Sequence, residues 1–208
     1  MIPPETALQF VAVAAVLALV PGPDNLFVLM QSAIRGARSG LAVTLGLCTG
    51  LIVHTTAVAF GVAALFAASA LAFTALKIVG AAYLLYLAYG AFRAGATAAP
   101  AADPAAGSAR ALYLRGVAMN ITNPKVAIFF LAFLPQFVAA DRGPVAWQML
   151  QLGALFMATS LLVFGAIAAV SGRLSGWLRR SPRAVPAMNK IAGLVFVGLA
   201  AKLATAQR

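Results

Sequence analysis

The stretch Val20-Pro21-Gly22-Pro23-Asp24-Asn25-Leu26 interrupts an apolar run that would otherwise pass for a plain membrane-spanning helix. Between residues 7 and 34, Asp24 is the only ionisable residue. The two prolines remove helical hydrogen bonds and the glycine between them weakens the helix further, so the helix is expected to break here. A buried acid at such a break is costly unless it has a function. A broken helix with a carboxylate at the break is typical of a transporter binding site.

The composition indicates a polytopic membrane protein. Of the 208 residues, 63% are hydrophobic and only 9% are charged, which excludes an ordinary soluble domain. The net charge of +11 does not indicate nucleic-acid binding, because Lys and Arg are spread over short segments between apolar runs. Cys48 is the only cysteine, so neither a disulfide within the chain nor a two-cysteine redox relay can form.

Six segments are long and apolar enough to cross a membrane, since a span needs about 20 residues. They are expected at about 6–32, 41–66, 71–92, 112–138, 145–171 and 184–204, with a tight turn near 67–70. The segment 96–110, rich in Ala, Pro and Gly, is predicted to be a flexible linker. It divides the chain into two halves, 1–95 and 111–208. The predicted fold class is therefore all-α, with three membrane helices in each half.

Each half opens with an interrupted span. The fourth span is broken at Asn120-Ile121-Thr122-Asn123-Pro124-Lys125, in a place comparable to that of Gly22-Pro23-Asp24 in the first span. Three spans per half place the second half in the membrane upside down relative to the first, which is the inverted-repeat plan of secondary transporters. The halves are otherwise weakly similar, so the inverted repeat is a hypothesis. It predicts that the two breaks meet near the bilayer midplane.

The distribution of basic residues predicts the orientation by the positive-inside rule. Nine arginines fall in the connections between spans 1 and 2, 3 and 4, and 5 and 6: Arg35, Arg38, Arg93, Arg110, Arg115, Arg173, Arg179, Arg180 and Arg183. The opposite side holds only Arg142, Arg208 and the boundary lysines Lys77 and Lys202. Both termini are therefore predicted to be periplasmic and the linker cytoplasmic.

Asp24 is the strongest candidate for chemistry, because the other acids, Glu5, Asp103 and Asp141, fall in the terminus and in loops. Its proposed role is to bind a proton or the ammonium group of a substrate. An alternative is that the Asp24 carboxylate caps the helix that resumes at Asn25. The two roles are compatible.

Lys125 carries the opposite charge in the second break. It can pair with Asp24, bind a substrate carboxylate, or extend its amine to the membrane interface. Backbone N–H groups at the resuming helices also attract anions, and the combination suits a zwitterion. The polar side chains beside the breaks, those of Asn25, Asn120, Thr122 and Asn123, either contact substrate or satisfy the interrupted backbone. Gly22, Pro23 and Pro124, which form the breaks, are also candidate residues of the binding site.

His54, the only histidine, is centred in the second span. It either relays protons or contacts substrate, or it forms a hydrogen bond between helices. Gly46 and Gly50 on the same span have the spacing that lets helices approach closely, although this spacing also recurs by chance. One histidine, one cysteine and one intramembrane acid cannot form a conventional metal site, and no P-loop or nucleophile elbow is present. We therefore expect neither an enzyme nor a cofactor.

These residues resemble the LysE/RhtB family of amino-acid exporters over nearly the whole chain. The resemblance rests on Pro21-Gly22-Pro23-Asp24-Asn25, on the segment 46–50 with His54, on the run 76–84, and on 120–125 followed by Phe129-Phe130 and Pro135-Gln136-Phe137. It implies six spans, a bacterial inner-membrane location, and export of amino acids or close derivatives driven by protons, often as homodimers. The chain resembles the homoserine/threonine branch more than the basic amino-acid branch. The alternative function is export of another small solute, such as a divalent cation.

Overall fold

The computed structural model describes residues 2–20, 22–68, 70–94, 108–181 and 183–205, and these residues form helices and no strand. The all-α prediction is therefore confirmed for this part of the chain. The elements are α1 (Pro4–Leu19), α2 (Pro23–Arg35), α3 (Ala37–Ala68), α4 (Ala70–Arg93), α5 (Ala109–Ile121), α6 (Pro124–Ile128), the π-helix η1 (Phe129–Phe133), the 3-10 helices η2 (Leu134–Phe137) and η3 (Ala140–Arg142), α7 (Val145–Arg180) and α8 (Ala184–Thr205).

Four helical segments are long and apolar enough to cross a membrane by themselves: Ala37–Gly61, Thr74–Arg93, Val145–Ser171 and Ala184–Thr205. Two further candidates are bent pairs, in which α1 meets α2 at 63° and Ala109–Ile121 meets Pro124–Phe137 at 49°. The number of candidate spans is six if each bent pair counts as one. Helix α7 continues to Arg180, beyond the predicted end at 171.

Two predicted connections include residues outside the described ranges. Residue 69 of the turn expected near 67–70 is one of them, between the end of α3 at Ala68 and the start of α4 at Ala70. Residues 96–107 of the linker expected at 96–110 are the others. The end of that linker is described: Ser108 is the N-cap of α5, and its hydroxyl accepts a hydrogen bond of 3.2 Å from the backbone N–H of Ala111. The side chain of Ser108 thus satisfies one of the free donors at the start of the helix.

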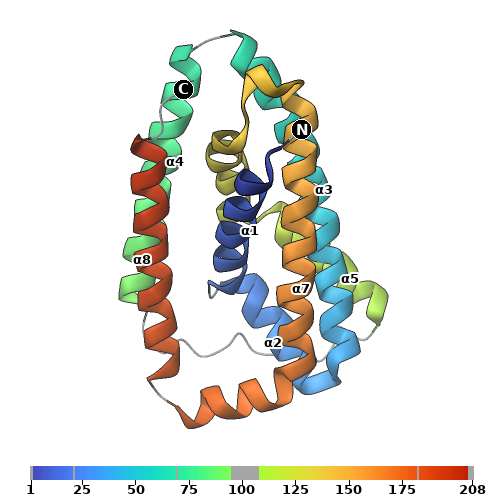
Figure 1. Cartoon of the computed structure of the whole chain (residues 1–208). Helices are drawn as coiled ribbons and strands as arrows, with labels where there is room; N and C mark the ends of the chain where they lie inside the picture. Colours follow the sequence, from blue (N-terminus) through green and yellow to red (C-terminus); the bar gives the residue numbers. More distant parts are fainter. Residues whose placement is uncertain (1, 21, 69, 95–107, 182, 206–208) are drawn as a thin grey trace.

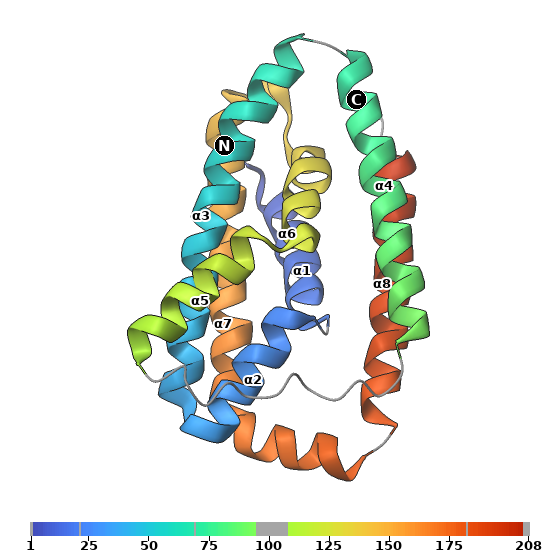
Figure 2. The same cartoon turned by 180° about the vertical axis from the view of Figure 1, so that it is seen from behind.

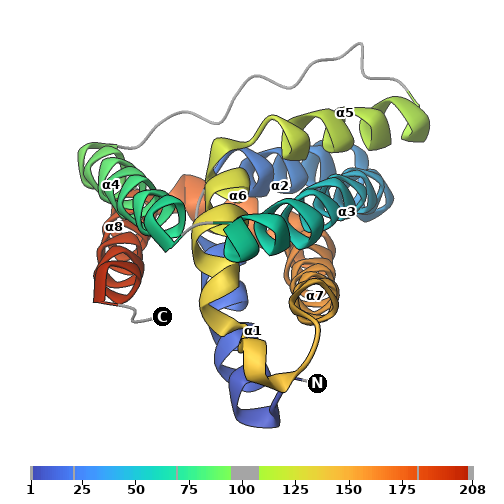
Figure 3. The ribbon, with the colours of Figure 1, turned by 90° about the horizontal axis from the view of Figure 1, so that it is seen from above.

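The bent pairs run in opposite directions through the molecule (Figure 1). Helices α1 and α2 lead from the end where both termini lie toward the end where α2 turns into α3. Helices α5 and α6 lead back, and η1 and η2 continue to the terminal end, as the view from behind also shows (Figure 2). Seen along the long axis, α4 and α8 form a pair on one side, and α3, α5 and α7 gather on the other (Figure 3).

Helices α3 and α5 cross with very little space between their backbones. A Cβ atom on Gly46 would collide with the backbone carbonyl of Tyr113, and one on Gly116 would collide with that of Val43. Glycine is required at both positions because the obstructing atoms belong to rigid backbone. The contact holds the second bent span against α3.

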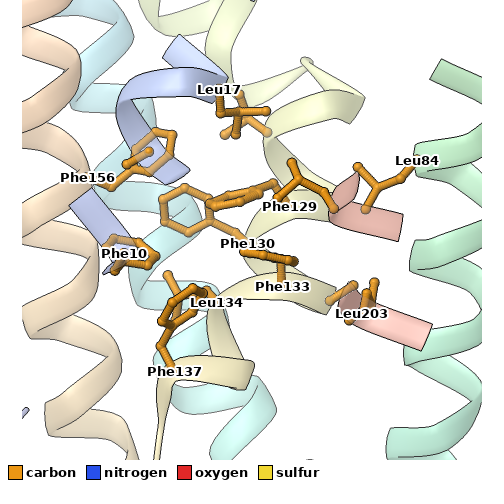
Figure 4. Close-up of a cluster of buried hydrophobic side chains, with 14 of the residues drawn as sticks. Phe10, Leu17, Leu84, Phe129, Phe130, Phe133, Leu134, Phe137, Phe156 and Leu203 are labelled. Carbon is orange, nitrogen blue, oxygen red and sulfur yellow. The ribbon is translucent and has the colours of Figure 1, made fainter. Parts of the chain in front are cut away.

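Two apolar clusters flank the breaks: one includes residues of α1 and η1, and the other includes residues of α2 and α5. The first, which we call the aromatic cluster, packs rings from α1, η1, η2 and α7 (Figure 4), namely Phe10, Phe129, Phe130, Phe133, Phe137 and Phe156. Phe10 and Phe137 make an edge contact with ring centroids 5.1 Å apart. The second, the α2 cluster, consists of Phe27, Val28, Val43, Leu47, Leu112, Phe164 and Ala168. The polar breaks are thus flanked by well-packed apolar side chains.

Candidate functional site

Proline starts the helix after each break. Helix α2 begins at Pro23 with Gly22 as its extended N-cap residue, and α6 begins at Pro124 with Asn123 as its N-cap residue. Proline suits the first helical position because its missing N–H has no partner there in any case. The Asn123 side chain completes the second cap, since its Oδ1 accepts a hydrogen bond of 3.0 Å from the N–H of Lys125.

The two breaks meet through their side chains. The amide Nδ2 of Asn123 donates a hydrogen bond of 2.8 Å to Oδ2 of Asp24. Both side chains are buried, with 4% of Asp24 and 8% of Asn123 exposed. Lys125 lies beside the same point, because its Nζ would be 3.3 Å from a Cβ atom built on Gly22. An attractive electrostatic interaction links Lys125 with Asp24.

The helix-capping alternative for Asp24 is wrong. Helix α2 begins at Pro23 and not at Asn25, so Asp24 lies inside the first turn, and Gly22 occupies the cap position. The Asp24 carboxylate accepts its hydrogen bond from the other half of the chain. Its contribution is therefore to the junction between the breaks.

Two acceptor atoms at the junction have no hydrogen-bond partner. They are Oδ1 of Asp24 and Oδ1 of Asn25, and both are buried. Asn25 is held in place because its Nδ2 donates to the carbonyl of Ala18 at the end of α1. Its free Oδ1 would lie 4.0 Å from a Cβ atom on Gly22, the same residue that the Lys125 amine approaches. Acceptors beside a cation offer contacts to both ends of a zwitterion.

His54 supports the second break from α3. Its Nε2 lies 3.1 Å from the backbone oxygen of Asn120, and a carbonyl can only accept, so Nε2–H is the donor. The Asn120 side chain is packed against α3, since a Cβ atom on Gly50 would lie 2.7 Å from its Oδ1. The structure thus brings His54 and Asn120 to the flank of the site. Pro23, Pro124 and Thr122 are exposed.

Two further polar residues were missed by the sequence analysis. Gln31 and Ser32 of α2 are 0% and 3% exposed, and the Gln31 amide atoms and Ser32 Oγ have no hydrogen-bond partner. Gln31 follows Asp24 by seven residues, which is about two helical turns, so both occupy the same face of α2. The sequence shows this seven-residue spacing of two polar residues within an apolar span, and the spacing could have identified Gln31.

The fold defines a polytopic helical membrane protein in which two bent helices meet at a buried acid and a lysine. The chain belongs to the LysE family, because the model of the LysE type translocator matches residues 15–207. Members of this family are transporters rather than enzymes. The resemblance inferred from the sequence is confirmed.

Curated relatives cover almost the full length of the chain. The homoserine/homoserine lactone efflux protein of Salmonella typhimurium is 32% identical over 203 residues, which is 98% of each chain. An uncharacterized membrane protein of Vibrio cholerae is 35% identical over 201 residues, covering 96% of this chain and 97% of the relative. No solved structure matches.

Proposed function

We propose that this protein exports amino acids or close derivatives across the bacterial inner membrane by proton antiport, with the substrate bound between the two breaks. The observation that carries the proposal is the junction of Asp24, Asn123 and Lys125, where two buried acceptors stand without partners. The printed name of the Salmonella relative supports a cargo of the homoserine type. Homoserine combines an ammonium group, a carboxylate and a hydroxyl.

The binding mode follows from charge and hydrogen-bonding capacity. The substrate ammonium donates to Oδ1 of Asp24 and Oδ1 of Asn25, which are acceptors only in this setting. The substrate carboxylate pairs with the Lys125 amine beside Gly22. The start of α2 adds backbone N–H groups and the positive end of the helix dipole. Asn123 keeps the Asp24 side chain oriented throughout.

Coupling arises because a proton and the substrate ammonium compete for the same carboxylate. An ionised Asp24 binds the ammonium, and a protonated Asp24 releases it. A proton entering from the periplasmic side then displaces the substrate, and loss of that proton to the cytoplasm restores the ionised site. Proton and substrate are therefore exchanged, because Asp24 binds either the proton or the substrate ammonium and never both at once.

The proposal includes two halves of opposite orientation, residues 1–95 and 111–208. The packing partners support it: α3 lies on α7 and α4 on α8, while α5 packs on α3 as α1 packs on α7. Exchanging the halves maps each of these contacts onto another. The turn from α2 into α3, which carries Arg35 and Arg38, lies at the end of the molecule away from the termini (Figure 1), and this supports periplasmic termini. Homodimer formation is part of the proposal on the family resemblance alone, and light scattering of the purified protein tests it.

The test is efflux from proteoliposomes preloaded with labelled amino acids, homoserine first, under an imposed pH gradient with and without an uncoupler. We expect Asp24→Asn to abolish gradient-driven efflux while the protein still inserts. The matched control is Asp141→Asn, which makes the same change in the exposed 3-10 helix η3 and should keep wild-type efflux. Undiminished efflux by Asp24→Asn removes Asp24 from the mechanism, and movement of a divalent cation in place of every amino acid overturns the substrate class.

A further inference from the structure

Gln31 is a polar side chain in an apolar setting. It is 0% exposed, and neither its Nε2 nor its Oε1 has a hydrogen-bond partner. One turn earlier on α2, Phe27 and Val28 belong to the α2 cluster. The neighbouring Ser32 also has an unpartnered oxygen, and a Cβ atom on Gly40 of α3 would touch both Ser32 and Ala168 of α7. This part of α2 is thus closed in by α3 and α7.

The position of Gln31 continues the line that begins at Asp24. At 3.6 residues per turn, Asp24, Gln31 and Arg35 fall within an arc of about 40° on α2, and Gln31 lies about 10 Å along the helix from Asp24. Helix α2 leads from the break to the end of the molecule where it joins α3 (Figure 1). The polar groups therefore follow one line from the proposed binding site toward the end of the molecule where α2 joins α3. We call this the arginine-rich end, because Arg35 and Arg38 flank the turn.

Packing does not explain a glutamine at this position. A buried donor or acceptor without a partner is destabilising, and an apolar side chain of the same size would avoid this cost. A primary amide can both donate and accept, so it suits a carboxylate, an ammonium group or a hydroxyl equally well. In the structure neither end of this amide has such a partner.

We propose that Gln31 is a second polar contact for the transported amino acid, on the path between Asp24 and the arginine-rich end. The inference rests on the proposed function and adds a specificity-determining residue to it. In the arrangement described here the path is closed, since Gln31 is fully covered. Helix α2 must separate from α3 and α7 for substrate and water to reach the amide, which is the movement that alternating access requires of a bundle.

The first experiment compares Gln31→Met with Gln31→Asn in reconstituted vesicles loaded with labelled homoserine. Met matches the size of Gln without its polar atoms, and Asn keeps the amide on a shorter arm. We expect Gln31→Met to lower the maximal efflux rate about tenfold, as the loss of one hydrogen bond to a charged group predicts. Its unfolding temperature should be unchanged or higher. Gln31→Asn should recover part of the rate.

A purely structural glutamine gives different results. The inference is overturned if Gln31→Met transports at the wild-type rate. It is equally overturned if Gln31→Asn transports no better than Gln31→Met. If Gln31→Met lowers the unfolding temperature, the decision passes to an accessibility measurement that does not depend on the rate.

That measurement uses single cysteines in a Cys48→Ala background and a charged, water-soluble thiol reagent. Gln31→Cys should react during transport and react more slowly at saturating homoserine, because substrate and reagent share the path. Leu29→Cys is the matched control. Leu29 is also buried and lies only about 3 Å from Gln31 along the axis of α2, but its side chain points about 160° away from that of Gln31. Equal, slow labelling of both cysteines overturns the inference.

The variant Asp24→Asn separates this inference from the proposed function. If Asp24→Asn is inactive while Gln31→Met is fully active, the binding site stands and the second contact is wrong. If Asp24→Asn transports normally, the proposed function fails whatever the Gln31 variants show.

Discussion

The Asn123 amide and the Asp24 carboxylate share a hydrogen bond of 2.8 Å between side chains that stand 99 residues apart in the chain. Asn123 uses both ends of its amide, because its Oδ1 also accepts from the Lys125 N–H and caps α6. One side chain therefore starts the helix after the second break and orients the acid at the first. Its orientation is fixed by the pair of contacts, since only the Nδ2 end can donate to a carboxylate.

The double role of Asn123 predicts a double effect of Asn123→Ala. Loss of the cap should lower the free energy of unfolding by about 1 kcal/mol. Loss of the contact to Asp24 should also lower efflux about tenfold, because hydrogen bonds to charged groups are among the stronger ones. Thermal unfolding in detergent and efflux per folded molecule measure the two effects separately.

Ser108→Ala is the matched control for that variant. Ser108 caps α5 through its hydroxyl, so its loss should cost similar stability. It lies at the exposed start of the helix, and efflux per folded molecule should be unchanged. Equal losses of efflux in the two variants would mean that Asn123 acts on stability alone.

The geometry of His54 predicts a brace rather than a proton relay. Its Nε2–H donates to the Asn120 carbonyl at the end of α5, and a glutamine amide can make the same bond without titrating. We expect His54→Gln to keep most of the efflux activity with an unchanged pH profile, and His54→Leu to lose most of it. Efflux measured at several pH values distinguishes the roles, because a relay requires that His54→Gln be as inactive as His54→Leu.

The breaks were predictable because their cause is local. Proline lacks an N–H and clashes with the preceding turn, so Pro23 and Pro124 mark the places where the helices restart. That Asn123 is the hydrogen-bond partner of Asp24 was not predictable, since this contact depends on how two distant segments cross. The capping interpretation failed for the same reason: the favoured local contact of an Asp was replaced by a contact with Asn123.

The outline of the spans was predictable from the length of the apolar runs, but the packing of their faces was not. Apolar composition looks the same on a face toward lipid and on a face toward protein, as Phe60 and Phe10 show with exposures of 63% and 0%. Gln31 illustrates the converse. Its helical register with Asp24 is visible in the sequence, whereas its burial without a partner appears only in three dimensions.

The crossing of α3 and α5 predicts a strong position dependence of glycine substitutions. Gly46→Ala places a methyl group against the Tyr113 carbonyl, which cannot move aside, and should cost about 1–3 kcal/mol as overpacking does. Gly61→Ala on the same helix meets nothing within 4 Å, so it should stabilise α3 by about 0.5–1 kcal/mol. Thermal unfolding of the two variants should therefore shift in opposite directions; equal shifts would mean that the close crossing is absent in the membrane.

The aromatic cluster predicts that packing rather than hydrophobic transfer stabilises the bundle. Phe10 is 0% exposed and contacts the rings of Phe129, Phe137 and Phe156. In a membrane, Phe10→Ala removes these ring contacts and leaves a cavity inside the bundle. We therefore expect the free energy of unfolding to fall by about 2–4 kcal/mol.

Phe60→Ala makes the same truncation on a side chain that is 63% exposed on α3, where lipid can fill the space. Its stability should change by less than about 0.5 kcal/mol. Denaturation of both variants in mixed micelles provides the comparison. A similar loss for Phe60→Ala would show that truncating a phenylalanine is costly wherever it lies, and that the contacts of Phe10 within the cluster contribute nothing specific.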